Sequence, residues 1–296
     1  MRATVVIHTR SSRSERRLPR LPELLAERRI AVDAIYLANS EKELRRWVRR
    51  ARKARAPLVI VGGGDGSMTT AAGELAHGDT VLGVLPLGTG NSFAQTLGLP
   101  DDLEGALDAI VARRIVRIDL GRVNGTYFAN FATIGLPAAT ANAAPRELKP
   151  WIGPLAYVVG GIRPFFRHRA FRARIRWDGG REELHTRQIV VANGRYFGHQ
   201  PIAHDATIVD RRLAFFSTTG TSHLDIARTY TAMALGLHER LPDAVKLTST
   251  ELVLRTKPRQ PVSIDGNALG RTPARFRVVP RALSVCVGPN FVDAPG

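Results

Sequence analysis

Two short apolar runs in the first third of the chain each end in a glycine-rich turn that leads into a helical pattern. Leu58 to Val61 is followed by Gly62-Gly63-Gly64-Asp65-Gly66-Ser67, and Val81 to Leu85 is followed by Pro86-Leu87-Gly88-Thr89-Gly90-Asn91. Strands that alternate with helices form a parallel sheet. Because crossover connections are right-handed, the carboxyl ends of these strands lie at one edge of the sheet. We therefore expect both turns to flank one crevice.

The same alternation begins near the N-terminus and continues to about residue 112. Strands are predicted at 4–7 and 31–37, and helices at 21–28, 68–77 and 101–112. Another helix is predicted after Ser40, which together with Glu43 has the spacing of a capping box. Arginines surround the apolar stripe of that helix, so it is expected to be amphipathic and basic.

The pattern changes near residue 115. Asn124-Gly125 and Asp178-Gly179-Gly180 are hairpin turn signals, and residues 171–177 alternate strictly between apolar and basic side chains. Further strands are predicted at 188–192, 213–217, 252–255, 262–264 and 283–287, with one helix near 224–235. We predict an α/β domain with a parallel sheet over 1–120 and a β-rich antiparallel domain over 121–296, with the ligand cleft between them.

Composition limits the cellular setting. The single cysteine, Cys286, cannot form an internal disulfide, and no Cys/His cluster has zinc-ligand spacing. The apolar runs are too short for a signal peptide or a membrane span, so we expect a cytoplasmic protein. The net charge of +17 comes from 43 basic and 26 acidic residues, and it attracts phosphate groups, nucleic acid or anionic bilayers.

The first glycine turn has the chemistry of a phosphate cradle. Successive backbone N–H groups and a helix N-terminus face one concavity there. It is neither a Walker loop nor a full G-x-G-x-x-G motif. A carboxylate at Asp65 would repel phosphate unless a hard cation such as Mg²⁺ lies between them, which favours a magnesium nucleotide. The alternative is that the glycines only turn the chain between strand and helix.

Gly63-Gly64-Asp65-Gly66-Ser67, followed by residues 85–91 and Phe93-Ala94, resembles the diacylglycerol kinase catalytic domain family, which includes bacterial soluble lipid kinases and sphingosine kinases. The first element is shared with NAD kinases and phosphofructokinases, whereas the spacing of the second suits lipid kinases. The resemblance extends to Arg117-Ile-Asp119-Leu-Gly121, Asn130-Phe131, Gly135, Lys149, 153–157, Asn193-Gly194 and Asp265-Gly266.

This resemblance implies an α/β domain of the NAD kinase and diacylglycerol kinase type, a C-terminal antiparallel β-sandwich, and transfer of the γ-phosphoryl group of ATP to a lipid hydroxyl. By the same resemblance Asp265 is the general base and Asp65 organises Mg²⁺. The implied nucleotide-binding residues are Gly63, Gly64, Gly66, Ser67, Gly88, Thr89, Gly90 and Asn91. The resemblance also places Asp119 and Lys149 in a polar network around the catalytic metal, and it implies a separate structural metal held by Asp210.

Several positions depart from the family pattern. Ser92 and Asn267 stand where the family has acidic residues, so metal affinity or turnover is expected to be weaker. The first strand leads into His8-Thr9-Arg10 in place of Asn-Pro, and Thr69-Thr70 replace a polar pair. For Asp265 the alternative is an ordinary turn residue, since Asp-Gly is a common hairpin turn, and for Asp210 it is a turn before the strand at 213–217.

The expected partners follow from this chemistry. They are ATP, a lipid alcohol and an anionic membrane surface contacted peripherally, with Arg163–Arg167, Arg169–Arg176 and the helix at 45–55 as basic candidates. Nucleic acid is not expected, because no reader motif is present. A zinc site at His199, His204 and Asp205 is also not expected. The edges of the predicted sandwich could pair two copies of the chain.

Two other functions stay open: a lipid- or nucleotide-binding protein without turnover, and a small-molecule kinase of the NAD kinase type.

Overall fold

The computed structural model describes residues 1–10, 18–143, 167–197, 200–201 and 207–293. The first half alternates strands and helices, as expected. Its elements are β1 (Arg2–His8), η1 (Leu18–Arg20), α2 (Leu21–Glu27), β2 (Ala31–Ala38), α3 (Glu41–Lys53), β3 (Leu58–Gly63), α4 (Asp65–Leu75), β4 (Val81–Pro86), α5 (Ser92–Thr96) and α6 (Leu103–Ala112).

The second half is mostly strands. Its elements are β5 (Ile115–Val123), β6 (Thr126–Phe128), β7 (Phe131–Gly135), α7 (Leu136–Ala143), β8 (Phe171–Trp177), β9 (Gly180–Thr186), β10 (Gln188–Ala192), β11 (Tyr196–Phe197), β12 (Gln200–Pro201), β13 (Leu213–Thr218), α10 (His223–Ala234), η2 (His238–Arg240), β14 (Ala244–Ser249), β15 (Glu251–Lys257), β16 (Pro261–Ile264), β17 (Asn267–Arg271) and β18 (Ala274–Cys286).

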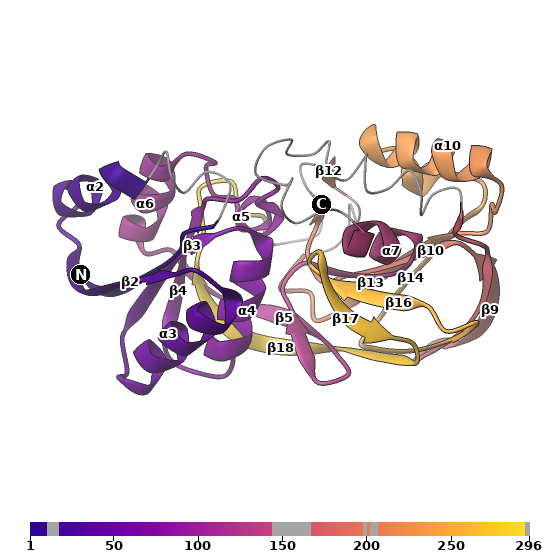
Figure 1. Cartoon of the computed structure of the whole chain (residues 1–296), viewed down its shortest axis with the longest axis horizontal. Helices are drawn as coiled ribbons and strands as arrows, with labels where there is room; N and C mark the ends of the chain where they lie inside the picture. Colours follow the sequence, from indigo (N-terminus) through magenta and orange to yellow (C-terminus); the bar gives the residue numbers. More distant parts are fainter. Residues whose placement is uncertain (11–17, 144–166, 198–199, 202–206, 294–296) are drawn as a thin grey trace.

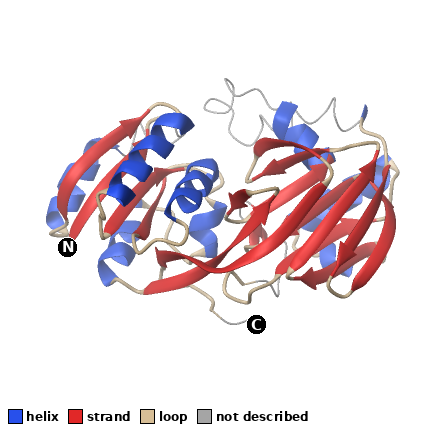
Figure 2. Cartoon of the chain, turned by 90° about the horizontal axis from the view of Figure 1, so that it is seen from below, coloured by secondary structure: helices blue, strands red, loops and turns tan. Residues whose placement is uncertain are grey.

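One sheet runs through both halves of the molecule. Its strand order is β2-β1-β3-β4-β18-β15-β8-β9, with β5 on β18 and β6 on β5. The pairs among β2, β1, β3 and β4 are parallel, whereas β18 pairs antiparallel with β5 and β15. Seen from below in Figure 2, the strands continue from one half into the other. The long strand β18 therefore joins the two halves.

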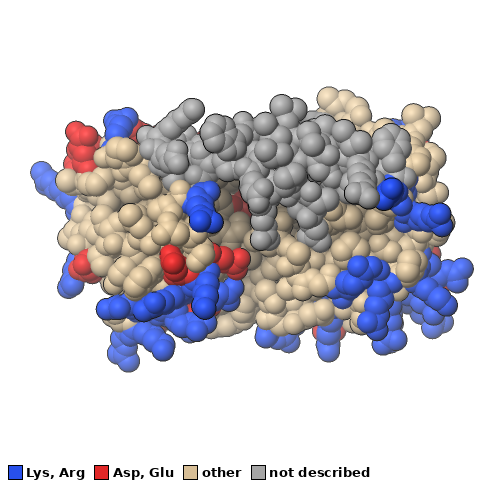
Figure 3. Space-filling view, viewed as in Figure 1, with Lys and Arg blue, Asp and Glu red and all other residues tan. Residues whose placement is uncertain are grey.

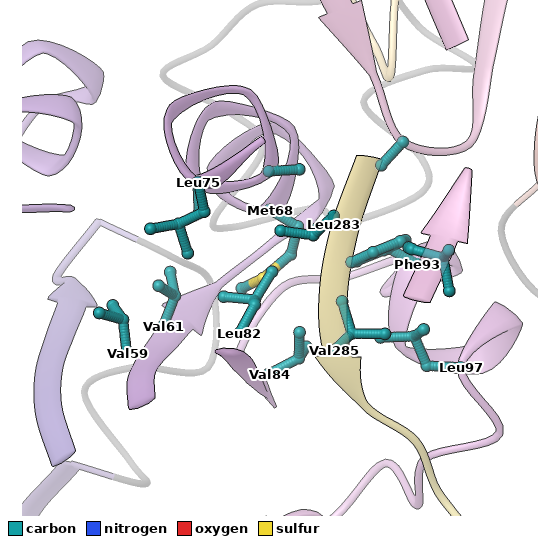
Figure 4. Close-up of a cluster of buried hydrophobic side chains, with 14 of the residues drawn as sticks. Val59, Val61, Met68, Leu75, Leu82, Val84, Phe93, Leu97, Leu283 and Val285 are labelled. Carbon is teal, nitrogen blue, oxygen red and sulfur yellow. The ribbon is translucent and has the colours of Figure 1, made fainter. Parts of the chain in front are cut away.

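The parallel part of this sheet is covered on both faces. Helices α3 and α4 pack on one face through residues such as Leu44, Val48 and Met68, and α2 and α6 pack on the other through Leu24 and Leu107. Figure 4 shows side chains of β3, β4, α4, α5 and β18 meeting in the first of these cores. Buried parallel strands need such apolar runs, which explains the composition of β3.

The second half is a β-sandwich. A second sheet, with the order β14-β13-β10-β7-β16-β17, is antiparallel and packs on β8, β15 and β18. Helices α7 and α10 lie over the outer face of this second sheet (Figure 1). The predicted fold class, a parallel α/β unit followed by an antiparallel sandwich, is confirmed. The division at residue 120 stays a prediction, and Ala282–Phe291 return to pack in the core of the first half.

Some element boundaries differ from the sequence predictions. Helix α4 begins at Asp65 rather than residue 68, because the glycine turn passes directly into the helix. Strand β18 starts at Ala274, about nine residues before the predicted strand, because its first part pairs with β15 and β5. Ser40 caps α3, but the Glu43 carboxylate accepts from the Asn39 N–H, so the capping box is not reciprocal.

Candidate active site

The turns after β3 and β4 are in direct contact at the carboxyl edge of the parallel sheet. The Leu87 N–H donates to the Gly63 carbonyl at 3.0 Å. A Cβ added to Gly88 would lie 2.5 Å from the Gly64 Cα. Because the two backbones approach so closely, no side chain fits between them. The two glycine turns therefore form one continuous backbone surface, with the first turn of α4 at its centre.

Ser67 lies in that first turn and contacts the end of β1. Its hydroxyl is 3.0 Å from His8 Nδ1, and the Ser67 residue is buried. Burial lowers the pKa of His8, although Glu41 partly opposes the shift, so the imidazole is neutral at neutral pH. The contact joins residues 59 positions apart. The sequence shows that the first strand leads into an atypical loop, but no local pattern predicts that His8 contacts Ser67.

Asp65, the first residue of α4, is directed at the start of α5. Its Oδ1 accepts a hydrogen bond from the Phe93 N–H at 2.9 Å. Burial raises the pKa of this carboxyl group, and hydrogen bonds from Phe93 and Ser92 oppose the shift. Asp65 thus ties the two glycine turns together through α5. It also places a carboxylate at the N-terminal end of a helix.

Asn91 organises the second turn. It adopts a left-handed backbone conformation with φ of 51° and is 3% exposed. Its side chain accepts from the Gly88 N–H at 2.8 Å and donates to the Gly88 carbonyl and to Asp101. These bonds close the turn on itself. Thr89 and Gly90, at the tip of the turn, are partly exposed.

Asp265 lies between β16 and β17, with a φ of 44° in a two-residue hairpin turn. The turn holds the carboxylate against residues of β7 and α4. Oδ1 accepts from the backbone N–H groups of Asn130 at 3.2 Å and Phe131 at 3.0 Å. Oδ2 accepts from the Ala129 N–H at 3.0 Å and from the Thr69 hydroxyl. The hairpin therefore carries the carboxylate to the helix that follows the first glycine turn.

The protonation equilibrium of Asp265 is strongly shifted. Burial raises its pKa to about 6, and the hydrogen bond from Thr69 and those from the backbone oppose the shift. The nearby charge of Asp65 makes a smaller contribution to this raised value. A carboxyl group with this pKa is ionised at neutral pH and is a stronger base than an ordinary aspartate.

Two residues that replace family carboxylates also lie at this site. Ser92 is buried beside Asp65, and Asn267 lies against the glycine turn, since a Cβ on Gly66 would be 2.6 Å from Asn267 Nδ2. No group of three or more His, Cys, Asp or Glu side chains that could hold a metal occurs within the described ranges. In the part of the chain that the structure describes, Asp65 begins the helix after the first glycine turn and Asp265 is bonded to Thr69 of that helix, while Asp101 contacts Asn91 of the second turn.

Two further carboxylates, the buried Asp119 and the partly buried Asp210, stabilise loops outside the glycine turns. Asp119 accepts from the N–H groups of Arg211 and Arg281, each at 2.7 Å. Asp210 accepts from the N–H groups of Thr207 at 2.9 Å and Arg212 at 2.8 Å. Burial raises the pKa of both. These bonds give each a structural role, and metal binding by Asp210 stays a prediction. Lys149, His199, His204 and Asp205 lie outside the described residues.

Comparison with known proteins agrees with this geometry. Residues 2–123 match the model of the diacylglycerol kinase catalytic domain, and residues 131–287 match that of the YegS C-terminal NAD kinase beta sandwich-like domain. The chain belongs to the diacylglycerol kinase catalytic domain family. The resemblance inferred from the glycine turns is therefore confirmed, and the chain is an enzyme of the lipid kinase type.

Individual relatives of this family are distant in sequence but similar in length. A diacylglycerol kinase of Staphylococcus haemolyticus is 25% identical over 271 residues, which cover 90% of this chain and 82% of the relative. One from Staphylococcus aureus is 25% identical over 247 residues, covering 82% and 78%. A solved structure described as a diacylglycerol kinase from Bacillus anthracis has a TM-score of 0.81 at 22% identity and covers 98% of this chain and 96% of its own. That likeness shows the fold.

Proposed function

We propose that this protein transfers the γ-phosphoryl group of ATP, in a Mg²⁺-dependent reaction, to the hydroxyl of diacylglycerol or a related lipid alcohol. The proposal rests mainly on the position of Asp265. A buried carboxylate with a raised pKa, bonded to the helix that follows a phosphate cradle, is where a general base for phosphoryl transfer is needed. Family membership supports the same reaction class.

The residues of the site have distinct roles in this mechanism. Backbone N–H groups of the turns at 62–67 and 86–91 bind the phosphates, and the positive end of α4 favours their negative charge. Asp265 accepts the proton of the acceptor hydroxyl as the oxygen attacks the γ-phosphorus. Phosphoryl transfer needs mainly alignment and charge neutralisation, so one base and a rigid cradle suffice on the protein side.

The donor set also fits a magnesium ion. Mg²⁺ is held in such sites by one or two carboxylates, with waters and substrate phosphates as its other ligands. Asp65 supplies a carboxylate at the helix N-terminus, and the Ser92 hydroxyl lies beside it. When bound, the ion neutralises charge on the phosphates. Because Ser92 and Asn267 are neutral, we expect weaker metal affinity or slower turnover than in relatives with acidic residues there.

The acceptor has acyl chains that remain in a bilayer, so we also propose cytoplasmic localisation with peripheral membrane contact. Within the described residues, no helix combines the length and apolar character needed to cross a bilayer. Basic side chains line the lower edge of both halves in Figure 3, which is the edge away from α10 in the same view of Figure 1. Helix α10, outermost over the sheet that carries Asp265, exposes Leu224 (79%) and the adjoining Leu235 (65%). Apolar residues exposed in this way suit insertion between lipid headgroups.

One assay tests the proposal. Labelled ATP is incubated with mixed micelles of diacylglycerol, monoacylglycerol, a sphingoid base or a polyprenol, in parallel with the Asp265→Ala variant. We expect label in a lipid product with the parent protein and at least a hundredfold less with the variant. Equal transfer by both proteins would remove Asp265 as the base. Transfer to NAD without micelles would favour the small-molecule kinase, and nucleotide binding without any transfer would favour a binding protein.

A further inference from the structure

The hydrogen-bonding capacity of the Asp265 carboxylate is fully used. Two carboxylate oxygens have about four lone-pair positions between them. Three are occupied by the backbone N–H groups of residues 129–131 and the fourth by the Thr69 hydroxyl. A base must accept a hydrogen bond from the hydroxyl that it deprotonates. An acceptor alcohol can therefore reach Asp265 only after one of these four donors leaves.

Thr69 is the donor that can leave. The other three belong to the backbone that follows β6 and to the first residue of β7 and are fixed by the fold, whereas the Thr69 hydroxyl moves by a single rotation about χ1. A helical threonine has a second common rotamer, in which its hydroxyl bonds a carbonyl three or four residues earlier. In α4 these carbonyls belong to Gly66 and Asp65. The rotation thus exchanges one hydrogen bond for another.

We propose that the Thr69 hydroxyl occupies the acceptor position on Asp265 until the lipid alcohol displaces it, and that it thereby keeps water from the base. The inference rests on the proposed function of Asp265. Whether the acceptor is the lipid alcohol or water, the acceptor oxygen bonds to the γ-phosphorus. The bond from that phosphorus to the β,γ-bridging oxygen then breaks, and ADP leaves with the electron pair. The acceptor proton moves to Asp265. If water attacked in place of the alcohol, ATP would be hydrolysed and no phosphorylated lipid would form. Thr69 is therefore a positioning residue that couples ATP consumption to phosphorylation of the lipid.

The chain supplies a matched control for this inference. Thr70 is the next residue of α4 and is as buried as Thr69, with exposures of 6% and 7%. Its hydroxyl donates to Glu41 Oε1 at 3.0 Å, on the side of α3, and does not contact Asp265. Replacing Thr70 removes a hydroxyl from the same helix turn without changing the base. Effects common to both positions therefore reflect helix packing rather than the acceptor position.

The experiment compares Thr69→Ala, Thr69→Val, Thr69→Ser and Thr70→Ala at pH 8, where Asp265 is ionised. Phosphate release from ATP is measured without lipid, and KM and kcat for diacylglycerol in mixed micelles are measured separately. Thr69→Ala leaves room for about one water molecule. We expect it to raise lipid-free ATP hydrolysis at least tenfold, and we expect this rise to disappear when Asp265→Asn is added.

Thr69→Val keeps the volume but removes the competing donor. We expect its KM for the lipid to fall about fivefold, which corresponds to one ordinary hydrogen bond, with little change in kcat and no added hydrolysis. Thr69→Ser keeps a hydroxyl, so its KM for the lipid and its rate of lipid-free ATP hydrolysis should be close to those of the parent protein. Thr70→Ala should change neither quantity. Melting temperatures verify that each variant is folded.

Two outcomes separate this inference from the proposed function. If Thr69→Ala hydrolyses ATP no faster than the parent protein and Thr69→Val leaves the KM unchanged, the inference is wrong even though lipid phosphorylation stands. If no lipid alcohol is phosphorylated but Thr69→Ala shows hydrolysis that depends on Asp265, the inference stands and the lipid acceptor is wrong.

Discussion

The pH dependence of the reaction tests the environment of Asp265 directly. The ionised carboxylate is the active form of a base, and burial raises its pKa to about 6. At pH 7 about nine-tenths of the enzyme then carries the ionised group, and at pH 5 about one-tenth does. Lowering the pH from 7 to 5 should therefore reduce kcat/KM about tenfold. An aspartate at the ordinary pKa of about 3.9 would lose less than about 10% over the same interval.

The measurement is the initial rate of lipid phosphorylation between pH 4.5 and 8, at lipid concentrations well below KM and with saturating ATP and Mg²⁺. Circular dichroism at each pH controls for unfolding. Thr69→Val provides a second check, because the Thr69 hydrogen bond lowers the pKa of Asp265 and its loss should move the acidic limb to higher pH. A limb centred near pH 4 in the parent protein would show that burial does not set the pKa of the base.

Three further predictions concern packing, the buried carboxylates and the membrane. Gly88→Ala should lower the free energy of unfolding by about 2 kcal/mol and weaken ATP binding, because its Cβ would lie 2.5 Å from backbone of the neighbouring turn. Gly73→Ala is the control: its Cβ would meet Tyr127 at 3.7 Å, so urea titration should show a gain of up to about 1 kcal/mol from helix propensity. Asp119→Asn should cost about 3 kcal/mol in the same titration, since its amide would face a backbone N–H donor; an unchanged midpoint would contradict the assigned bonds. Leu224→Glu should weaken co-sedimentation with anionic vesicles about tenfold, whereas Ile35→Glu, at a position 45% exposed on β2, should not.

Local features of the fold were predictable because their physical causes lie within a few residues. Asn124-Gly125 and Asp178-Gly179 form two-residue hairpin turns between β5 and β6 and between β8 and β9. Asp102 caps α6 by accepting from the Gly105 N–H at 2.6 Å. In each case the turn or cap is favoured by the residue's own backbone preference or hydrogen-bonding reach.

Features that depend on distant segments were not predictable in this way. The Thr69 to Asp265 contact joins residues 196 positions apart. The His8 to Ser67 contact joins the end of β1 to the first turn of α4. Strand β18 was predicted too short because only its last part is a continuous apolar run, whereas its first part alternates buried side chains with the exposed Arg275 and Arg277. The role of Asn91 in closing its own turn also depended on a backbone conformation that its residue type allows but does not require.

The sequence by itself determined the alternation of strands and helices in the first half, the change to strands in the second half and the chemistry available at the glycine turns, although α7 and β14 were not predicted. Strand periodicity, caps and turn residues act over short distances, and the spacing of the two turns identified the family. Only the tertiary structure decided that a hairpin from the second half brings Asp265 onto α4, surrounded by backbone donors and Thr69. The physical reason is that burial and hydrogen bonding set the basicity of a carboxylate, and both depend on which distant segments surround it.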